Sequence, residues 1–104
     1  MYPTLFTIGK VGIPTYTVLL DLGLILVNEG KFEEAMGELT TVLSLPETAG
    51  MSDVQAVAHY GRAAAQANLG KLNEALAEVE RSLAIAPRSP DALALRAKLR
   101  SVLR

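Results

Sequence analysis

Few residues in this sequence combine types and spacings that could do chemistry. His59 is the only histidine and there is no cysteine, so no metal-ligand set and no thiol nucleophile is present. Ser52, Asp53 and His59 supply the residue types of a hydrolytic triad, but the sequence around Ser52 does not resemble a nucleophile elbow. No glycine-lysine-serine sequence marks a phosphate-binding loop. We therefore predict a protein that is not an enzyme and that needs no metal and no cofactor.

Basic residues form another candidate site. Arg96, Arg100 and Arg104 recur every four residues, which puts them in one stripe on a helix. Such a stripe could bind phosphate or an acidic partner, although a solvated helix face is its more common role. It could also pair with another copy, since acidic residues concentrate early in the chain, at Glu29, Glu33, Glu34, Glu38 and Glu47. A net charge of -1 argues against a nucleic-acid partner.

Length and composition favour one helical domain. The 104 residues suit a single domain, and their 50% apolar content is enough for a packed core. Residues 54–104 are rich in alanine, leucine and glutamate and poor in aromatic residues, which favours helices over strands. We therefore expect an all-α protein.

Two segments of the sequence repeat each other. They begin with GKFEEA at residues 30–35 and with GKLNEA at residues 70–75. Each continues with apolar residues at helical spacing and ends near a proline, Pro46 or Pro87, which stops a helix. The apolar stripes, which we expect to be buried beneath a charged opposite face, are Ala35, Leu39, Val42 and Leu43, and Ala75, Val79, Leu83 and Ile85.

Another helical stretch and a glycine precede each repeated segment. Residues 14–28 and 54–68 have helical patterns, and Gly30 and Gly70 suit the left-handed residue that ends a helix. At residues 52–55 the sequence SDVQ has the spacing of a capping box. A fifth helix is expected from residue 90 to about residue 103, because SPD at residues 89–91 places a cap, a proline and an acid in order.

These units resemble the tetratricopeptide repeat, a helix–turn–helix unit of 34 residues. In the first unit Leu22-Gly23 stands before Gly30 as the family's Leu-Gly does. The second unit departs from the family, with His59 in place of tryptophan and Arg62-Ala63 in place of Leu-Gly. The resemblance implies a right-handed α-solenoid of about two and a half hairpins. Its parts are an N-terminal lead at 1–15, repeat 1 at 16–46, a loop at 47–53, repeat 2 at 54–87 and a C-terminal helix at 90–104.

The resemblance also implies a function, because repeats of this family bind proteins. We expect a cytoplasmic interaction or scaffolding module that holds a peptide or partner helix in a concave groove made by the leading helices. Its groove residues would include Asn28, Tyr60, Ala64 and Asn68. The two asparagines share one repeat position, where an amide could bind a peptide backbone or simply end the helix. Since about three repeats are usually needed to cover all apolar faces, we also expect self-association or continuation in a longer protein.

Residues 1–27 have a different character. They run from MYPTLFTIG through Tyr16 into an apolar stretch, and they resemble the N-terminus of prolipoprotein diacylglyceryl transferase, a membrane enzyme. That family's catalytic segments are absent, so its activity is not implied. An alternative is therefore a membrane-anchored protein in which residues 1–27 form a transmembrane or interfacial segment. Against insertion, residues 11–27 are short for a span, and Asp21 would cost about 2.5–3.5 kcal/mol at the membrane centre.

Overall fold

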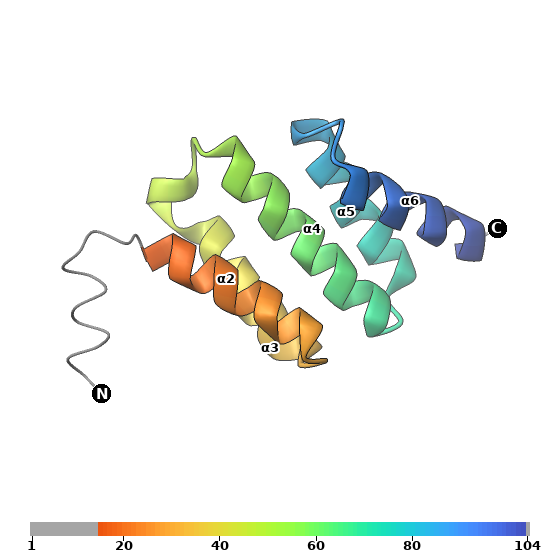
Figure 1. The fold of residues 1–104 in the computed structure, drawn as a ribbon, viewed down its shortest axis with the longest axis horizontal. Helices are drawn as coiled ribbons and strands as arrows, with labels where there is room; N and C mark the ends of the chain where they lie inside the picture. The colour runs from red at the N-terminus through yellow and green to blue at the C-terminus, as the bar shows by residue number, and fades with distance from the viewer. Residues whose placement is uncertain (1–14, 104) are drawn as a thin grey trace.

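The computed structural model describes residues 15–103, which form five α-helices joined by short turns (Figure 1). The helices are α2 (Thr15–Asn28), α3 (Phe32–Ser44), α4 (Ser52–Asn68), α5 (Leu72–Ile85) and α6 (Pro90–Leu103), with the 3-10 helix η1 (Pro46–Thr48) between α3 and α4. No strand occurs in these residues. The prediction of an all-α protein is therefore confirmed, and each predicted helix is found within a few residues of its expected bounds.

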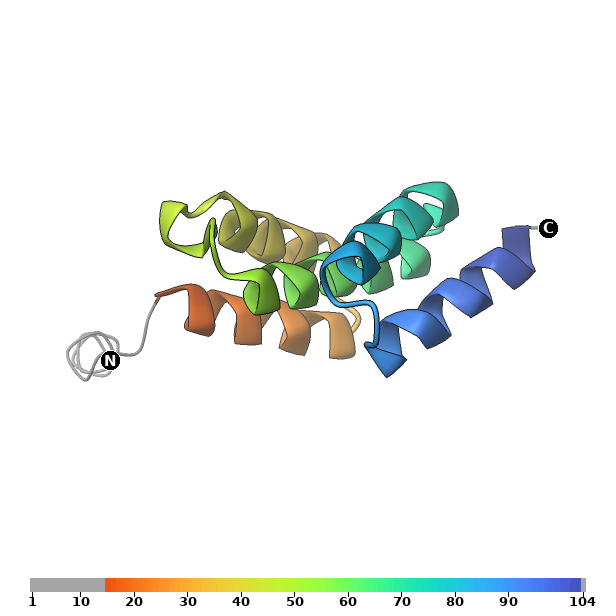
Figure 2. The same ribbon diagram turned by 90° about the horizontal axis from the view of Figure 1, so that it is seen from above.

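The helices pack as two pairs followed by a single helix. Helix α2 lies along α3, and α4 lies along α5, while α3 also packs against α4 and so joins the pairs. Helix α6 packs on α5. Figure 1 shows α4 between α2 and α6, and Figure 2 shows α3 and α5 on the opposite side of the molecule from α2 and α6. The first helix of each pair and α6 therefore share one face.

Both pairs turn at a glycine in the left-handed conformation, as predicted. The φ angle is 82° at Gly30 and 84° at Gly70. In the first turn the Lys31 N–H donates to Leu26 O at 2.9 Å and the Gly30 N–H donates to Val27 O at 3.1 Å. The second turn makes the equivalent two bonds at 2.9 and 3.2 Å. This is the Schellman arrangement, which satisfies the last carbonyl groups of the first helix and reverses the chain.

Leu39 of α3 packs where α2 and α4 approach it most closely. Its side chain is fully buried. A Cβ atom added at Gly23 of α2 would lie 2.6 Å from Leu39 Cδ2, and one added at Gly61 of α4 would lie 2.7 Å from Leu39 Cδ1. Neither helix could present a side chain at these positions without moving away from Leu39. The two glycines therefore set the spacing of α2, α3 and α4.

Small residues also pack the second half of the molecule. A buried cluster joins α4, α5 and α6, and its members are Ala63, Ala75, Val79, Leu83, Ala92 and Leu99. Three of the four residues in the predicted α5 stripe belong to this cluster. The fourth, Ile85, is only partly buried. In α3, Ala35, Leu39 and Val42 of the predicted stripe are buried and Leu43 is partly buried. The stripe predictions are confirmed in both repeated segments except at these two partly buried positions.

The connection between the two pairs is more ordered than the loop that we expect at residues 47–53. It contains η1, and Thr48 is fully buried there. The Thr48 hydroxyl oxygen lies 2.8 Å from Val42 O and 2.9 Å from Leu45 O, at the end of α3. Both carbonyl groups also accept a backbone N–H, Val42 O from Leu45 and Leu45 O from Thr48, so the hydroxyl proton, shared between them, adds to the bonds that end α3.

The capping-box prediction for α4 is wrong. Ser52 is already the first residue of α4, Met51 precedes it as the N-cap, and no side chain caps the helix. The Gln55 amide instead donates back to Thr48 O and Ala49 O, both at 2.9 Å. At α6 the cap is as predicted, since the Ala92 N–H donates to the hydroxyl oxygen of Ser89 at 3.4 Å.

The membrane alternative concerns residues 1–27, and residues 1–14 of this segment lie outside the residues that the structure describes. Within residues 15–103, no helix has the length and apolar character needed to cross a bilayer. Helix α2, which contains most of the apolar stretch, has only 14 residues. Leu26 of this helix is buried against the rest of the protein, as the core-helix interpretation of the sequence expects.

Replacing two helical glycines by alanine should have opposite effects on stability. Gly23→Ala should lower the free energy of unfolding by about 1–3 kcal/mol, because the new methyl group overlaps the fully buried Leu39. Gly37→Ala should raise it by about 0.5–1 kcal/mol, because nothing lies within 4 Å of the added Cβ and alanine favours the helix. Urea denaturation of the two variants and the parent measures both changes. Equal stabilisation by both substitutions would show that the α2–α3 contact is looser than described.

Candidate functional site

A groove of about 420 Å³ opens on the face shared by α2, α4 and α6. It lies over the first half of α4, with Leu24 of α2 on one side and the start of α6 on the other. The nine residues that line it are Leu24, Asp53, Ala56, Val57, Tyr60, Ser82, Ala86, Ser89 and Asp91. Its volume is within the range of small ligand pockets, so it can hold a few side chains of a partner.

The floor of the groove is apolar and its charges are all acidic. Val57 stays 38% exposed although it is a large apolar residue, and it lies beside the ring of Tyr60 one turn along α4. Asp53 and Asp91 occupy the first turns of α4 and α6, and both are exposed. The groove therefore offers apolar surface next to two carboxylates.

The two serine hydroxyl groups of the groove already have partners. The Ser82 hydroxyl donates to Ala56 O at 2.7 Å, which ties α5 to α4 beneath the groove. The Ser89 hydroxyl accepts the Ala92 N–H that begins α6. Both serines thus hold the helices that form the groove, and neither is arranged as a nucleophile with a base beside it.

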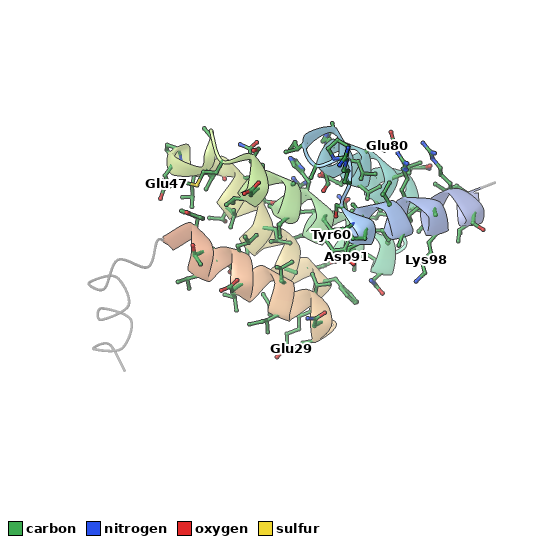
Figure 3. All side chains as sticks on the ribbon, turned by 45° about the horizontal axis from the view of Figure 1, so that its top comes forward. Glu29, Glu47, Tyr60, Glu80, Asp91 and Lys98 are labelled. Atoms are coloured by element: carbon green, nitrogen blue, oxygen red, sulfur yellow. The ribbon has the colours of Figure 1, made fainter. Side chains whose placement is uncertain are left out.

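The pKa of Tyr60 reflects both the burial of its ring and the charge beside it. Burial raises the pKa of the Tyr60 phenol above its ordinary value, and the nearby carboxylate of Asp91 raises it further. Figure 3 shows Tyr60 and Asp91 next to each other, on α4 and α6. Both effects disfavour a phenolate, so Tyr60 is a neutral hydroxyl at physiological pH that can donate or accept a hydrogen bond.

A buried carboxylate fixes α4 on α5. Glu78 of α5 is 3% exposed, and His59 Nδ1 lies 2.8 Å from its Oε1. Arg62 Nη2 and Arg81 Nη1 lie 3.3 and 3.2 Å from its Oε2. Since a carboxylate only accepts, the Nδ1 atom of His59 carries the proton in this contact. Glu78 thus lies at the interface between α5 and α4, with its charge balanced by residues of α4 and by Arg81.

Of the residues predicted to line the groove, Tyr60 does so. Ala64, one turn further along α4, is partly buried and lies outside the lining. Asn28 and Asn68 are the last residues of α2 and α4 and are exposed. The Asn68 amide donates to Ala64 O of its own helix at 2.8 Å, so its donor serves helix termination.

Two of the three arginines of the predicted basic stripe, Arg96 and Arg100, lie on α6 in the described residues. Arg100 of α6 pairs with Glu80 of α5, with 3.0 Å between Arg100 Nη2 and Glu80 Oε2. Arg96 is partly buried on α6, and Arg104 lies outside the described residues. Both side chains of the Arg100–Glu80 pair are exposed, so the pair contributes little to stability. It nevertheless gives Arg100, the middle arginine of the stripe, a partner within the protein.

The sequence signals for this site were weaker than those for the fold. Asp53 and Asp91 have the obvious role of first-turn helix acids, and only the packing of α4 beside α6 brings them to one groove. Glu78 could have been suspected, because it lies three residues after buried Ala75 and four before buried Ser82. Within the described part of the chain, no group of three or more potential metal ligands is present.

Removal of the buried carboxylate should be costly. Glu78→Ala should lower the free energy of unfolding by about 3–5 kcal/mol, because Arg62 and His59 would lose their partner in a half-buried position. The matched variant Glu80→Ala breaks an exposed pair on the same helix and should cost less than about 1 kcal/mol. Urea denaturation measures both values. Similar small losses would mean that the Glu78 cluster does not hold α4 on α5.

Tyr60 should deprotonate at a higher pH than the ordinary tyrosine value of about 10. Because the pKa is higher in the folded than in the unfolded chain, the associated stability is present below about pH 10 and is lost as the pH rises through the folded pKa. Asp91→Asn should lower the pKa only in part, since burial is the larger cause. Phenolate absorbance of the parent minus that of Tyr60→Phe gives the titration. If the titration curve of Tyr60 were unchanged in Asp91→Asn, the Asp91 carboxylate would not be a cause of the raised pKa.

Comparisons of the chain with protein-family models, with curated proteins and with solved structures found no match. No relative therefore supplies a ligand or an activity for the groove. What the groove can bind follows from its own shape, burial and charge.

Proposed function

We propose that this protein is a non-catalytic interaction module of the tetratricopeptide-repeat type. Two features support the fold part of the proposal. Two helix pairs turn at Gly30 and Gly70 with the same hydrogen bonds, and the second pair packs on the first through α3 and α4. With α6 as a further leading helix, we propose that these helices form about two and a half hairpins of a right-handed solenoid. The 40 residues between the glycines, instead of 34, are accommodated by the ordered segment around η1.

The observation that carries the function is the groove on the face of the leading helices. Val57 and Tyr60 leave apolar surface accessible there, and the volume of about 420 Å³ suits several side chains of an extended peptide or a partner helix. Of the polar groups around the groove, the hydroxyl groups of Ser82 and Ser89 hold helices together, and the carboxylates of Asp53 and Asp91 are exposed. Such a site favours recognition, because it supplies apolar area and charge but no nucleophile with an adjacent base.

Association through a second surface belongs to the same proposal. Leu22 and Ile25 of α2 are 39% and 50% exposed, on the side of α2 that no helix within residues 15–103 covers. In a solenoid this is where a preceding hairpin would stack, so a second copy or a preceding repeat would bury both side chains. Light scattering of the full chain tests this part of the proposal.

Peptide selection tests the groove directly. Peptides from a random library that bind the immobilised full chain should lose at least about tenfold in affinity for Val57→Arg, which places a long charged side chain in the groove. Fluorescence anisotropy with the synthetic peptides measures the affinity. Val57 is exposed on a helix, so the substitution should leave the fold intact, and circular dichroism checks this.

The control is Ala84→Arg, which changes an exposed position of α5 that does not line the groove. It should bind the same peptides as tightly as the parent does. A library that yields no binders, or binders that tolerate Val57→Arg, would reject the groove as the interaction site.

A further inference from the structure

We infer that the groove recognises a segment in which an apolar side chain lies next to lysine or arginine. This inference rests on the proposed function of the groove and adds the chemistry of its partner. It combines the apolar floor at Leu24, Val57 and Tyr60 with the two carboxylates at Asp53 and Asp91. The five residues come from three helices, so the combination exists only in the folded chain.

The charges that line the groove are of one sign. Asp53 and Asp91 are its only charged lining residues, and no lysine or arginine is among the nine. Each aspartate sits at a helix start, where the helix contributes about half a positive charge. The two carboxylates outweigh the two helix starts, so the groove keeps a net charge of about −1. A partner that carries a cation meets an attractive field there, and an acidic partner is repelled.

Neither carboxylate is neutralised by an ion pair of the described residues. The ion pairs of residues 15–103 involve Glu29, Glu78 and Glu80 as acids, and both groove aspartates lie outside them. Both aspartates are also exposed at the mouth of the groove. An incoming ammonium or guanidinium group can thus reach them without breaking an existing contact.

The position of Tyr60 explains why apolar and cationic groups should be adjacent in the partner. Its ring lies among the apolar lining residues while Asp91 stands beside it (Figure 3). Lysine and arginine bury the aliphatic part of the side chain on apolar or aromatic surface while the charged end reaches a carboxylate. The raised pKa of Tyr60 agrees with a groove that is both desolvated and negative.

The test compares peptides selected on the full-length parent and on the double variant Asp53→Asn/Asp91→Asn. Both changes keep the side-chain shape and remove only the charge. The matched control is Glu34→Gln/Glu74→Gln, which removes first-turn acids from α3 and α5, away from the groove. It reproduces any loss of helix stability without changing the groove, and circular dichroism checks that all three proteins are folded.

The expected result has two parts. Peptides that bind the parent and lose binding to Val57→Arg should be enriched in lysine and arginine, and this enrichment should vanish on the aspartate double variant but persist on the control. Changing the cationic residue of one such peptide to glutamine should weaken binding to the parent about 3- to 10-fold at low salt, and the effect should shrink at high salt. The same glutamine peptide should bind the aspartate double variant about as well as the cationic peptide does. In a double-mutant cycle this result assigns the effect to contact between the cation and the two aspartates.

Two other outcomes overturn the inference and can be told apart. If groove-dependent peptides appear without lysine or arginine enrichment, or with equal enrichment on the aspartate double variant, the groove binds peptides but does not select cations. If no groove-dependent peptide appears on any of the three proteins, the proposed function fails together with the inference.

Discussion

Leu39 can fill the space between α2 and α4 because both helices present a glycine where it packs. The rest of the arrangement follows from this contact. Any side chain at Gly23 or Gly61 would collide with Leu39, so α2 and α4 can only be this close while these positions stay empty. Leu24 Cδ2 also lies 3.1 Å from the Cβ position of Gly61, which places this groove residue directly against α4. The α2 side of the groove is therefore set by the same close packing as the core.

The other side of the groove depends on polar contacts between α4 and α5. The Glu78 carboxylate of α5 contacts His59 and Arg62 of α4, and the Ser82 hydroxyl of α5 donates to Ala56 O of α4. Directional interactions therefore fix α5 on α4 at two places. Buried polar groups are costly unless they are paired, and pairing them restricts how the two helices can slide or rotate. Helix α6 then begins at Pro90, after a short connection from Ile85, and brings Asp91 beside Tyr60. The floor of the groove is thus held by contacts between α4 and α5, although the groove opens to solvent.

The residues that fill the core and the residues that line the groove overlap only in part. The buried positions of α3 and α5 are filled by Leu39, Val42, Val79 and Leu83, whereas the groove is lined by Leu24 of α2, four residues of α4 and four residues between Ser82 and Asp91. Ala56 and Ser82 belong to both sets, so only substitutions at exposed lining residues such as Asp53, Val57 and Asp91 are expected to leave the core undisturbed.

The sequence by itself determined the helices, because helical spacing, glycine turns and prolines act locally. Gly30 and Gly70 adopt the conformation that their positions require, and the bounds of α3, α5 and α6 agree with the pattern of apolar residues. Only the tertiary structure decided which polar residues face inward and which helix ends meet. Glu78 lies at helical spacing from the predicted buried residue Ala75, but its charge can be buried only because His59 and Arg62, 19 and 16 positions away in the chain, lie beside it. Asp53 and Asp91 share a groove because α4 packs beside α6, a contact between distant segments that periodicity in either helix does not encode.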